Sequence, residues 1–320
     1  MLRASSRPPR SLVTGGAGFI GSHLVEALLA EGGEVRVLDD LSTGRRDNLP
    51  TRADGLEFVE GSIRRSDLLG AALEGVETVF HLAGLVAVPE SLETPQRSIE
   101  FNDLAVFDLY QTALERGVRR VVFSSSSAVY GDLEAPHHED LCPRPTTPYA
   151  IHKLLGEHYG LYFSEYKGLE SVYLRYFNVY GPRQRPDSPY SGVISLFLDR
   201  LRRGEPGLIF DDGAQTRDFI FVQDVARANL AAARKPGVSG QSFNIGSGQS
   251  ISIGALYQIL AGLANRPDLA PSFAPARAGD VRHSTGLVAK AAQWLDFQTE
   301  TSLADGLART WAWFLASGGH

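Results

Sequence analysis

Apolar and polar positions alternate along the first half of the chain in two rhythms. Six short runs rich in β-branched and aromatic residues predict strands: SLVTG, EVRVLDD, LEFVEG, TVFHLAG, VRRVVFSSSS and ESVYLRYFN. Between the first two strands, residues 22–31 place apolar side chains on one helical stripe, and Gly32 and Gly33 end that helix. Strands that alternate with helices form βαβ units, so we expect an α/β fold with a parallel sheet.

The pattern changes after about residue 175. Loops rich in proline and glycine, such as YGPRQRPDSPYSG and DDGAQTRD, separate shorter helices such as residues 193–203. We therefore expect a first domain over residues 1–175 and a second, smaller α+β lobe over residues 176–320. Some segments of the second part, residues 219–222 among them, are expected to return to the first. No internal period of the length of a structural repeat recurs, which excludes a repeat architecture.

A glycine-rich string, TGGAGFIG, joins the first strand to the first helix. Gly15 permits a tight turn, Gly18 lets the backbone approach a pyrophosphate, and Gly21 lets the helix pack close to the strand. The helix N-terminus adds unpaired amides that favour phosphate. Asp39 ends the second strand, where a carboxylate accepts hydrogen bonds from a ribose 2′-hydroxyl and repels a 2′-phosphate. The sequence thus predicts a Rossmann-type doubly wound parallel sheet that binds NAD rather than NADP.

A second group of polar residues, Tyr149 and Lys153, has a spacing of four. On a helix both side chains share one face, although an ordinary surface pair has the same spacing. The serine run SSSS directly follows an apolar strand, at the edge of the sheet where open α/β folds bind ligands. A free tyrosine titrates near ~10 and needs a nearby cation to act as a base at neutral pH. Lys153 and an oxidised nicotinamide would supply that charge.

Composition and charge exclude several classes of protein. Thirty-one basic and 37 acidic residues give a net charge of −6, which disfavours nucleic-acid binding. We expect no membrane span, because no apolar stretch is long enough. The single cysteine, Cys142, permits no intramolecular disulfide and fits a reducing compartment, so we expect a cytoplasmic protein. His137 and His138 precede two acidic residues, but adjacent side chains in a loop point apart, and we expect no metal site.

A series of strings in order along the chain carries a resemblance to a known family: TGGAGFIGSHL, LDDLSTG, HLAGLVAVPES, SSSSAVYGD, PYAIHK, LRYFNVYGPRQ, QTRDFIFVQD, FNIGSG and RAGDVRHS. On these strings, which cover essentially the whole chain, the sequence resembles the extended short-chain dehydrogenases of the NAD-dependent epimerase/dehydratase family. Among these it is most similar to the UDP-hexose 4-epimerases. The resemblance implies an NAD-binding Rossmann domain over residues 1–175 and a nucleotide-sugar-binding lobe over residues 176–320.

The resemblance also implies the residues of the catalytic and cofactor sites. Ser126, four residues before Tyr130, corresponds to the catalytic hydroxyl, with its neighbours Ser125 and Ser127 left open as alternatives. Tyr149 corresponds to the base, with Lys153 beside it. The residues implied for NAD are Gly15, Gly18, Phe19, Ile20, Gly21, Asp39, Ser62, Ile63, Leu82, Ala83, Gly84, Asn102, Tyr149, Lys153 and Phe177. Ser62 stands where many relatives carry an aspartate.

For the substrate, the resemblance implies a UDP-sugar held firmly by its nucleotide. Arg217 and Arg277 would face the diphosphate, and Phe210 would stack on uracil. Ser284, a small residue beside carbon 2 of the sugar, would leave room for an acetamido group. The full set implied for the substrate is Ser126, Asn178, Val193, Phe210, Arg217, Arg277, Asp280 and Ser284.

The function implied is NAD-dependent 4-epimerisation of UDP-glucose and UDP-galactose, and of their N-acetylated counterparts, through a 4-keto sugar. Related dehydratases carry an Asp-Glu pair after the catalytic hydroxyl, where this chain has Ser127 and Ala128, and the decarboxylases usually have a glutamate at Ala128. A UDP-glucuronate 4-epimerase or decarboxylase, another NAD-dependent sugar-nucleotide oxidoreductase, and an NAD-sensing scaffold without turnover stay open. Helices near residues 103–116 and 149–166 carry surplus apolar residues, and the resemblance implies that they form a homodimer interface.

Overall fold

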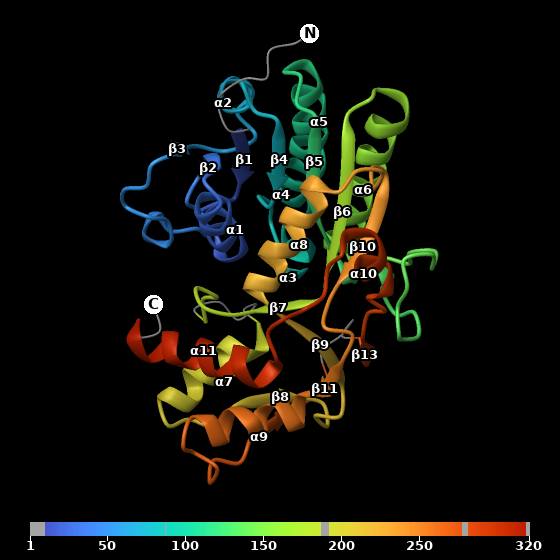
Figure 1. Cartoon of the computed structure of the whole chain (residues 1–320). Helices are drawn as coiled ribbons and strands as arrows, with labels where there is room; N and C mark the ends of the chain where they lie inside the picture. The colour runs from blue at the N-terminus through green and yellow to red at the C-terminus, as the bar shows by residue number, and fades with distance from the viewer. Residues whose placement is uncertain (1–9, 87, 187–191, 277–280, 318–320) are drawn as a thin grey trace.

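The chain folds into two parts in the computed structural model, which describes residues 10–86, 88–186, 192–276 and 281–317. Figure 1 shows a larger part with a central sheet and helices on both faces, and a smaller lobe below it. The larger part contains the sheet and the first helices, and the smaller lobe is built from later segments. The α/β fold with a parallel, Rossmann-type sheet is confirmed.

The large sheet has seven strands in the order β3, β2, β1, β4, β5, β6, β10, and every pairing is parallel. The first six strands of the sequence analysis are all present, and the seventh comes from the second half of the chain. Its strands are β1 (Arg10–Thr14), β2 (Glu34–Asp39), β3 (Leu56–Glu60), β4 (Thr78–His81), β5 (Arg120–Ser126), β6 (Glu170–Tyr176) and β10 (Gln241–Ile245).

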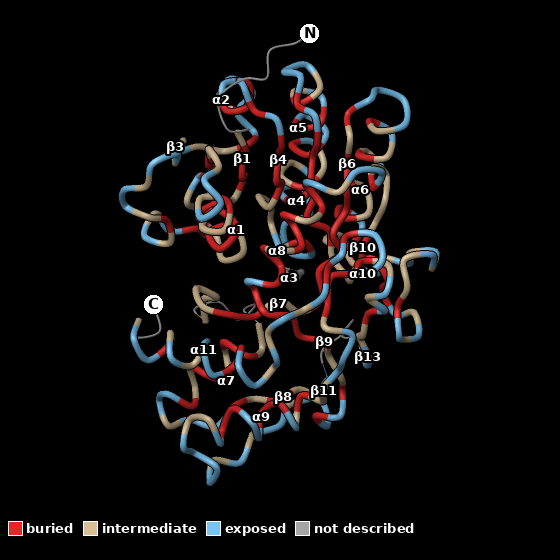
Figure 2. Tube along the Cα trace, viewed as in Figure 1, coloured by how far each residue is buried: buried red, intermediate tan, exposed pale blue. Residues whose placement is uncertain are grey.

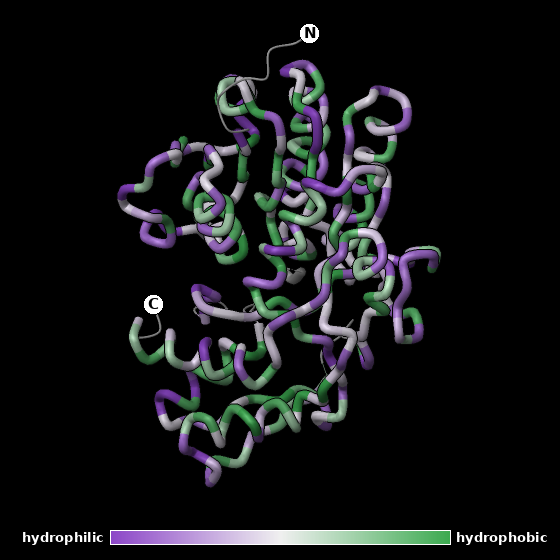
Figure 3. The backbone as a smooth tube through the Cα atoms, viewed as in Figure 1, coloured by the Kyte–Doolittle hydropathy of each residue, from purple (hydrophilic) through white to green (hydrophobic). Residues whose placement is uncertain are grey.

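Helices cover both faces of this sheet because its central strands carry apolar side chains on both sides. Val13 packs into a core with one set of helices, while its neighbour Leu12 packs into the core on the opposite face. Figures 2 and 3 show the central strands as buried and largely hydrophobic segments. Helices α1 (Phe19–Ala30), α8 (Val222–Arg234) and α10 (Ala289–Leu295) contribute to the first core, and α2 (Ser66–Ala72), α5 (Ala105–Glu115) and α6 (Pro148–Tyr166) to the second.

Short segments complete the large part. A one-turn π-helix, η2 (Glu100–Leu104), leads directly into α5. The remaining elements of this part are η1 (Arg46–Asn48), α3 (Val88–Glu93), α4 (Pro95–Ile99) and η3 (Ser127–Tyr130).

The small lobe is built around β9 (Thr216–Phe221), which pairs with β7 (Asn178–Tyr180), β11 (Ser250–Ser252) and β13 (His283–Ser284). A separate parallel pair joins β8 (Leu208–Phe210) to β12 (Ser272–Ala274). Helices α7 (Val193–Arg202), α9 (Ile253–Leu263) and α11 (Leu303–Ala316) enclose the core of this lobe.

The chain returns to the large part around residues 219–222, where β9 ends and α8 begins, through side-chain packing rather than through strand pairing. These residues do not join the large sheet, because β9 forms hydrogen bonds within the small one. Alternate side chains of β9 instead serve both cores: Phe219 and Phe221 pack into the small lobe, and Ile220 packs into the core below α8. The strand that joins the large sheet is β10.

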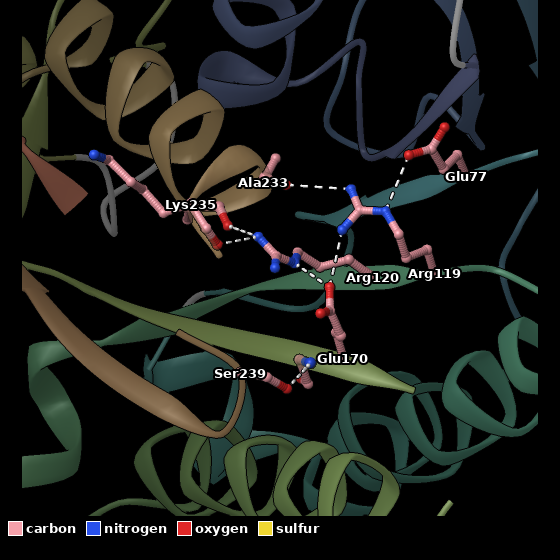
Figure 4. A network of polar contacts seen from close by, with 9 residues as sticks. Glu77, Arg119, Arg120, Glu170, Ala233, Lys235 and Ser239 are labelled. Atoms are coloured by element: carbon pink, nitrogen blue, oxygen red, sulfur yellow. Dashed lines mark hydrogen bonds and ion pairs between the residues drawn. The ribbon is translucent and has the colours of Figure 1, made fainter. Parts of the chain in front are cut away.

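A network of ion pairs around the buried Arg120 lies at the amino ends of the strands (Figure 4). Arg120, at the start of β5, donates from Nε to Glu170 at 2.8 Å and from Nη1 to the carbonyl oxygens of Ala232 and Lys235 at 2.8 Å each. These carbonyls end α8 and have no partner within the helix. Arg119 links Glu170 to Glu77 at 2.9 and 3.0 Å. Open α/β sheets bind ligands at the opposite end, outside the carboxyl ends of the strands.

Candidate active site

A cavity of about 770 Å³ lies along the carboxyl ends of the large sheet. It extends from the glycine loop after β1 to the serine run after β5 and the start of α6. Fifteen of the residues predicted for cofactor and catalysis line it: Gly15, Gly18, Phe19, Ile20, Gly21, Asp39, Ser62, Ile63, Leu82, Ala83, Gly84, Ser126, Tyr149, Lys153 and Phe177. The volume is within the range of small-molecule and cofactor sites.

The glycine loop has no room for side chains. Gly15 has a φ of +69°, and a Cβ there would lie 2.7 Å from the amide nitrogen of Ala83. A Cβ on Gly21 would lie 2.2 Å from the carbonyl oxygen of Gly15, so any larger residue would push α1 away from the loop. Gly18 is the N-cap of α1, and its backbone leaves the first amides of the helix facing the cavity. The loop therefore fits the pyrophosphate of a dinucleotide.

Asp39 lies at the end of β2, on the wall of the cavity. Its carboxylate accepts hydrogen bonds from the amides of Ala17 and Leu41, each at 2.9 Å. Burial raises the pKa of Asp39, and the two amides oppose that shift. Besides facing the position expected for a ribose, Asp39 holds the glycine loop through the amide of Ala17, a role that its place at the end of a strand does not reveal.

Asn102 does not line the cavity, in contrast to the other predicted cofactor residues. Its amide group bonds the backbone nitrogen and oxygen of Leu85, both at 2.9 Å. A Cβ on Gly84 would lie 2.8 Å from Asn102 Oδ1. Asn102 therefore holds the loop after β4, and Gly84 of that loop forms the cavity wall.

Ser126, Tyr149 and Lys153 converge at one end of the cavity. Ser126 is the last residue of β5, and its hydroxyl accepts a hydrogen bond from the amide of Ala128 at 3.2 Å. The same side chain lies next to Tyr149, in the first turn of α6. Lys153, one turn further along α6, donates from Nζ to the carbonyl oxygen of Ser124 at 2.8 Å. Its ammonium lies 5.8 Å from the centre of the Tyr149 ring. Pro148 and the N-cap Thr147, which accepts from the amide of Ala150, start the helix at this point.

Burial shifts the titration of both groups. It raises the pKa of Tyr149, and the neighbouring hydroxyl of Ser126 opposes this shift. Burial lowers the pKa of Lys153 to about 8. A protonated Lys153 close to the ring, together with the charge of an oxidised nicotinamide, would oppose the rise in the pKa of Tyr149 and favour the phenolate.

The structure distinguishes the serines of the run. Ser125 donates its hydroxyl to the buried Glu157, whereas Ser126 faces Tyr149. Ser124 bonds the hydroxyl of Tyr176 at 3.1 Å. Ser127 already belongs to η3. Of the three candidates, Ser126 is the one placed to act with the tyrosine.

Glu157 belongs to a buried network that the sequence analysis missed. It forms an ion pair with Arg175 of β6 at 2.7 Å, and Arg175 also donates to the hydroxyl of Tyr130 at 3.1 Å. Tyr149, Lys153 and Glu157 are spaced four apart on α6, so this repeat was the signal available in the sequence.

Arg183 is a second residue that sequence reasoning missed. It lies in the YGPRQ string, has a φ of +71°, and lines the cavity. Its guanidinium donates to Ser22 at 3.2 Å and to Glu26 at 2.5 Å, both on α1. This contact ties the loop after β7 to the helix that follows the glycine loop.

Ser126 lines the cavity, whereas three other predicted substrate residues lie on the small sheet and do not line it: Asn178, Arg217 and Ser284. Asn178 of β7 donates to the carbonyl oxygen of Asp218 at 2.8 Å, and Ser284 of β13 is in register with Arg217 of β9. Phe210 ends β8 and Val193 begins α7. Arg277 and Asp280 lie outside the described residues, so the structure does not locate them.

Two other expectations concern metals and membranes. His137 is buried and its Nε2 lies 3.0 Å from the carbonyl oxygen of Leu133, while His138 is half exposed. Within the described parts of the chain, no group of three potential ligands is placed to hold a metal ion. The same parts contain no helix with the length and apolarity that a membrane crossing requires.

Comparison with known proteins agrees with this geometry. Residues 11–246 match the NAD dependent epimerase/dehydratase family. The chain belongs to this family. A UDP-glucose 4-epimerase of Mycolicibacterium smegmatis is 41% identical over 310 residues, which cover 95% of this chain and 98% of that protein. Most of the residues described above, from the glycine loop to β10, lie within the matched range.

Two solved structures of epimerases have the same fold along nearly the whole chain. One is a UDP-N-acetylglucosamine 4-epimerase of Methanobrevibacter ruminantium in complex with UDP-N-acetylmuramic acid; it has a TM-score of 0.93, 35% identity, and coverage of 97% of this chain and 99% of that one. The other is a UDP-glucose 4-epimerase of Thermotoga maritima with UDP-glucose, which has a TM-score of 0.92, 38% identity, and coverage of 96% and 99%. The expected family membership is confirmed.

Proposed function

We propose that this chain is an isomerase that catalyses NAD-dependent 4-epimerisation of a UDP-hexose. The observation that carries the proposal is the convergence of Ser126, Tyr149 and Lys153 at one end of a cavity whose other end is a glycine loop. The epimerases among its relatives support the same reaction. The test is an epimerisation assay with purified protein on UDP-glucose and UDP-galactose, with the Tyr149→Phe variant as the negative control.

The residues that line the cavity are suited to bind NAD. Gly15 and Gly21 line the cavity at positions where a Cβ would collide with the backbone. The amides at the start of α1 face the cavity beside them. Asp39 would accept a hydrogen bond from a ribose hydroxyl, and Lys153, at the other end of the cavity, would lie beside the nicotinamide. When bound, NAD supplies reversible hydride transfer at carbon 4 of the sugar.

The side chains then divide the proton chemistry between them. Tyr149, with Lys153 beside it, removes the proton of the 4-hydroxyl, and Ser126 holds that oxygen by a hydrogen bond. A 4-keto sugar results. After the sugar has turned its other face to the cofactor, Tyr149 returns the proton to the new 4-hydroxyl. The centre is inverted and no net oxidation occurs.

Neighbouring residues argue against two related reactions. Dehydration and decarboxylation in this family use acidic groups next to the catalytic hydroxyl, whereas Ser127 and Ala128 open η3 at those positions. A UDP-glucuronate 4-epimerase would use the same three residues, and UDP-glucuronate therefore belongs in the assay. An NAD sensor without turnover would bind cofactor and convert none of these sugars.

The substrate side of the proposal assigns UDP to the small lobe. Arg217 on β9 is proposed to bind the diphosphate, with Asn178 on the adjacent β7 as a hydrogen-bond donor to the substrate. Ser284, in register with Arg217, is proposed to leave space at carbon 2, so that N-acetylated UDP-hexoses are also substrates.

We further propose that the enzyme is a homodimer. The exposed faces of η2, α5 and α6 carry large apolar side chains: Leu104, Phe107, Ile151, Tyr162 and Tyr166. Neighbouring exposed apolar residues of this number are typical of protein interfaces. A second copy would cover them by packing the same two helices against each other. Sedimentation at micromolar concentration tests this, and a monomer would contradict it. A cytoplasmic location is proposed on the single cysteine alone.

A further inference from the structure

Asp218, next to Arg217 on β9, has a carboxylate that is completely buried. Its Oδ1 accepts hydrogen bonds from the amide and the hydroxyl of Ser247, at 2.8 and 2.7 Å. Its Oδ2 accepts from the amides of Gly248 and Gly286, at 3.1 and 3.3 Å. Four donors thus converge on one side chain, and three of them are backbone amides.

These bonds join segments that are far apart in the sequence. Ser247 and Gly248 lie in the loop between β10 and β11, and Gly286 follows β13. The carbonyl oxygen of Asp218 also accepts from Asn178 of β7, at 2.8 Å. One residue therefore connects the small-sheet strand β9 to two loops and to β7.

The packing around this carboxylate is tight. A Cβ on Gly246 would lie 2.7 Å from Asp218 Oδ2, and a Cβ on Gly286 would lie 2.6 Å from the Phe177 ring. The two glycines allow both loops to approach the carboxylate. The same arrangement places Phe177, a residue of the cofactor cavity, against the segment that carries Ser284.

The segments that Asp218 connects are those that carry the proposed substrate residues. Asn178 of β7 donates to the backbone of Asp218, and Arg217 of β9 is the residue before it. Ser284 of β13 lies two residues before Gly286, whose amide donates to the Asp218 carboxylate. Successive residues of a strand point to opposite sides, so Arg217 and Asp218 face different environments. Arg217 is half-buried, whereas Asp218 is turned into the interior.

We propose that Asp218 is a positioning residue that assembles the nucleotide-sugar pocket from these segments. The inference rests on the proposed function, since it assigns that pocket to a UDP-hexose. Substitution by asparagine keeps the shape but replaces one acceptor oxygen by an NH₂ group. That group would face amide donors, and about half of the hydrogen bonds would be lost.

Asp224 offers a matched control. It is also buried, at 1% exposure, and its carboxylate accepts from the amides of Glu300 and Thr301 at 3.2 and 3.1 Å. It also pairs with Arg227 at 2.7 Å. It lies on α8 and does not line the cofactor cavity. Both substitutions remove a buried charge that holds a loop, but only one of those loops belongs to the proposed pocket.

The experiment compares Asp218→Asn with Asp224→Asn. Steady-state kinetics on UDP-glucose, calorimetric titration with UDP-glucose, NAD binding and Tm are measured for both variants. For Asp218→Asn we expect KM and the Kd of UDP-glucose to rise on the order of 10-fold. The change in kcat should be smaller, and NAD affinity should stay within about 2-fold of wild type. Asp224→Asn should lower Tm and leave KM and Kd unchanged.

The outcomes separate this inference from the proposed function. Unchanged KM and Kd in Asp218→Asn, or an equal rise in Asp224→Asn, would overturn the positioning role. A wild-type chain that binds UDP-glucose without epimerising it would overturn the proposed reaction, while the calorimetric comparison still decides the role of Asp218. If Asp218→Asn does not fold, Ser247→Ala replaces it, because it removes one donor from the same carboxylate. An increase in Kd of about 3-fold would support the inference, and no increase would overturn it.

Discussion

Ser125 and Ser126 are consecutive residues of β5, and their hydroxyls face different partners. Ser125 donates to the buried Glu157, and Ser126 lies next to Tyr149 at the end of the cavity. The alternation of side chains along a strand produces this division. One serine is tied to the ion pair behind the site, and the other is available to a substrate.

This division predicts different effects of two alanine substitutions. Ser126→Ala should lower kcat by about 10-fold or more, because a hydrogen bond to the reacting oxygen is lost. Ser125→Ala should leave Glu157 with one donor fewer and reduce the free energy of unfolding by about 1–3 kcal/mol, with a smaller effect on kcat. Urea unfolding and turnover of both variants check the assignment. The opposite pattern would identify Ser125 as the catalytic hydroxyl.

Tyr149→Phe should lower turnover by at least ~10²-fold, at the low end of the contribution of general acid–base catalysis. The ring is retained, so binding of the UDP-sugar should be nearly unchanged. Turnover and calorimetry on the same preparation measure both. A variant with wild-type turnover would refute the mechanism.

The lowered pKa of Lys153 should make the free energy of unfolding depend on pH. Its pKa is lowered by burial from the model-peptide value of 10.5 to about 8 in the folded state. Between these values the unfolded chain binds more protons than the folded chain, so the free energy of unfolding rises with pH. Wild type should therefore gain stability relative to Lys153→Met as the pH increases from about 8 to 10. Thermal unfolding of both proteins across this range tests the sign, and a constant difference would contradict the lowered pKa.

The same titration affects activity. Above the pKa of Lys153 the ammonium loses its charge and no longer favours the tyrosinate, so kcat should fall on the alkaline side. Lys153→Arg keeps a charge at all these pH values. If that variant retains measurable turnover, the fall of its kcat on the alkaline side should occur at higher pH than in wild type. If kcat falls at the same pH in both proteins, the titration belongs to another group.

Arg217→Ala should weaken UDP binding by about 10-fold or more, because a charge-assisted contact with phosphate is removed. Calorimetric titration with UDP measures this directly. Arg234, which pairs with Glu31 on the surface of the large part, provides a control substitution with no expected effect. If wild type and the variants at Arg217 and Arg234 bind UDP with equal affinity, Arg217 does not contact the diphosphate.

Ser284→Tyr should narrow the pocket beside carbon 2 of the sugar. Wild type is expected to epimerise UDP-GlcNAc and UDP-GalNAc as well as UDP-glucose and UDP-galactose, and the variant should lose the acetamido pair selectively. The assay compares kcat/KM for both pairs. If the tyrosine variant retains the acetamido substrates unimpaired, another residue limits the size of the substrate.

The sequence by itself determined the elements of the nucleotide-binding half. Apolar runs predicted six of the seven strands of the large sheet, and the glycine spacing located the loop after β1. The interval between Tyr149 and Lys153 put both on one face of a helix. These features depend on local geometry, since strand alternation, helical spacing and the space around a glycine are all properties of a short segment.

Only the tertiary structure decided how distant segments combine. It added β10 as the seventh strand, divided β9 between two cores, and turned Ser126 rather than Ser125 toward Tyr149. It also brought Ser247, Gly248 and Gly286 to the carboxylate of Asp218. Nothing in a local pattern specifies these contacts, because they join residues tens of positions apart and form only when both cores have packed.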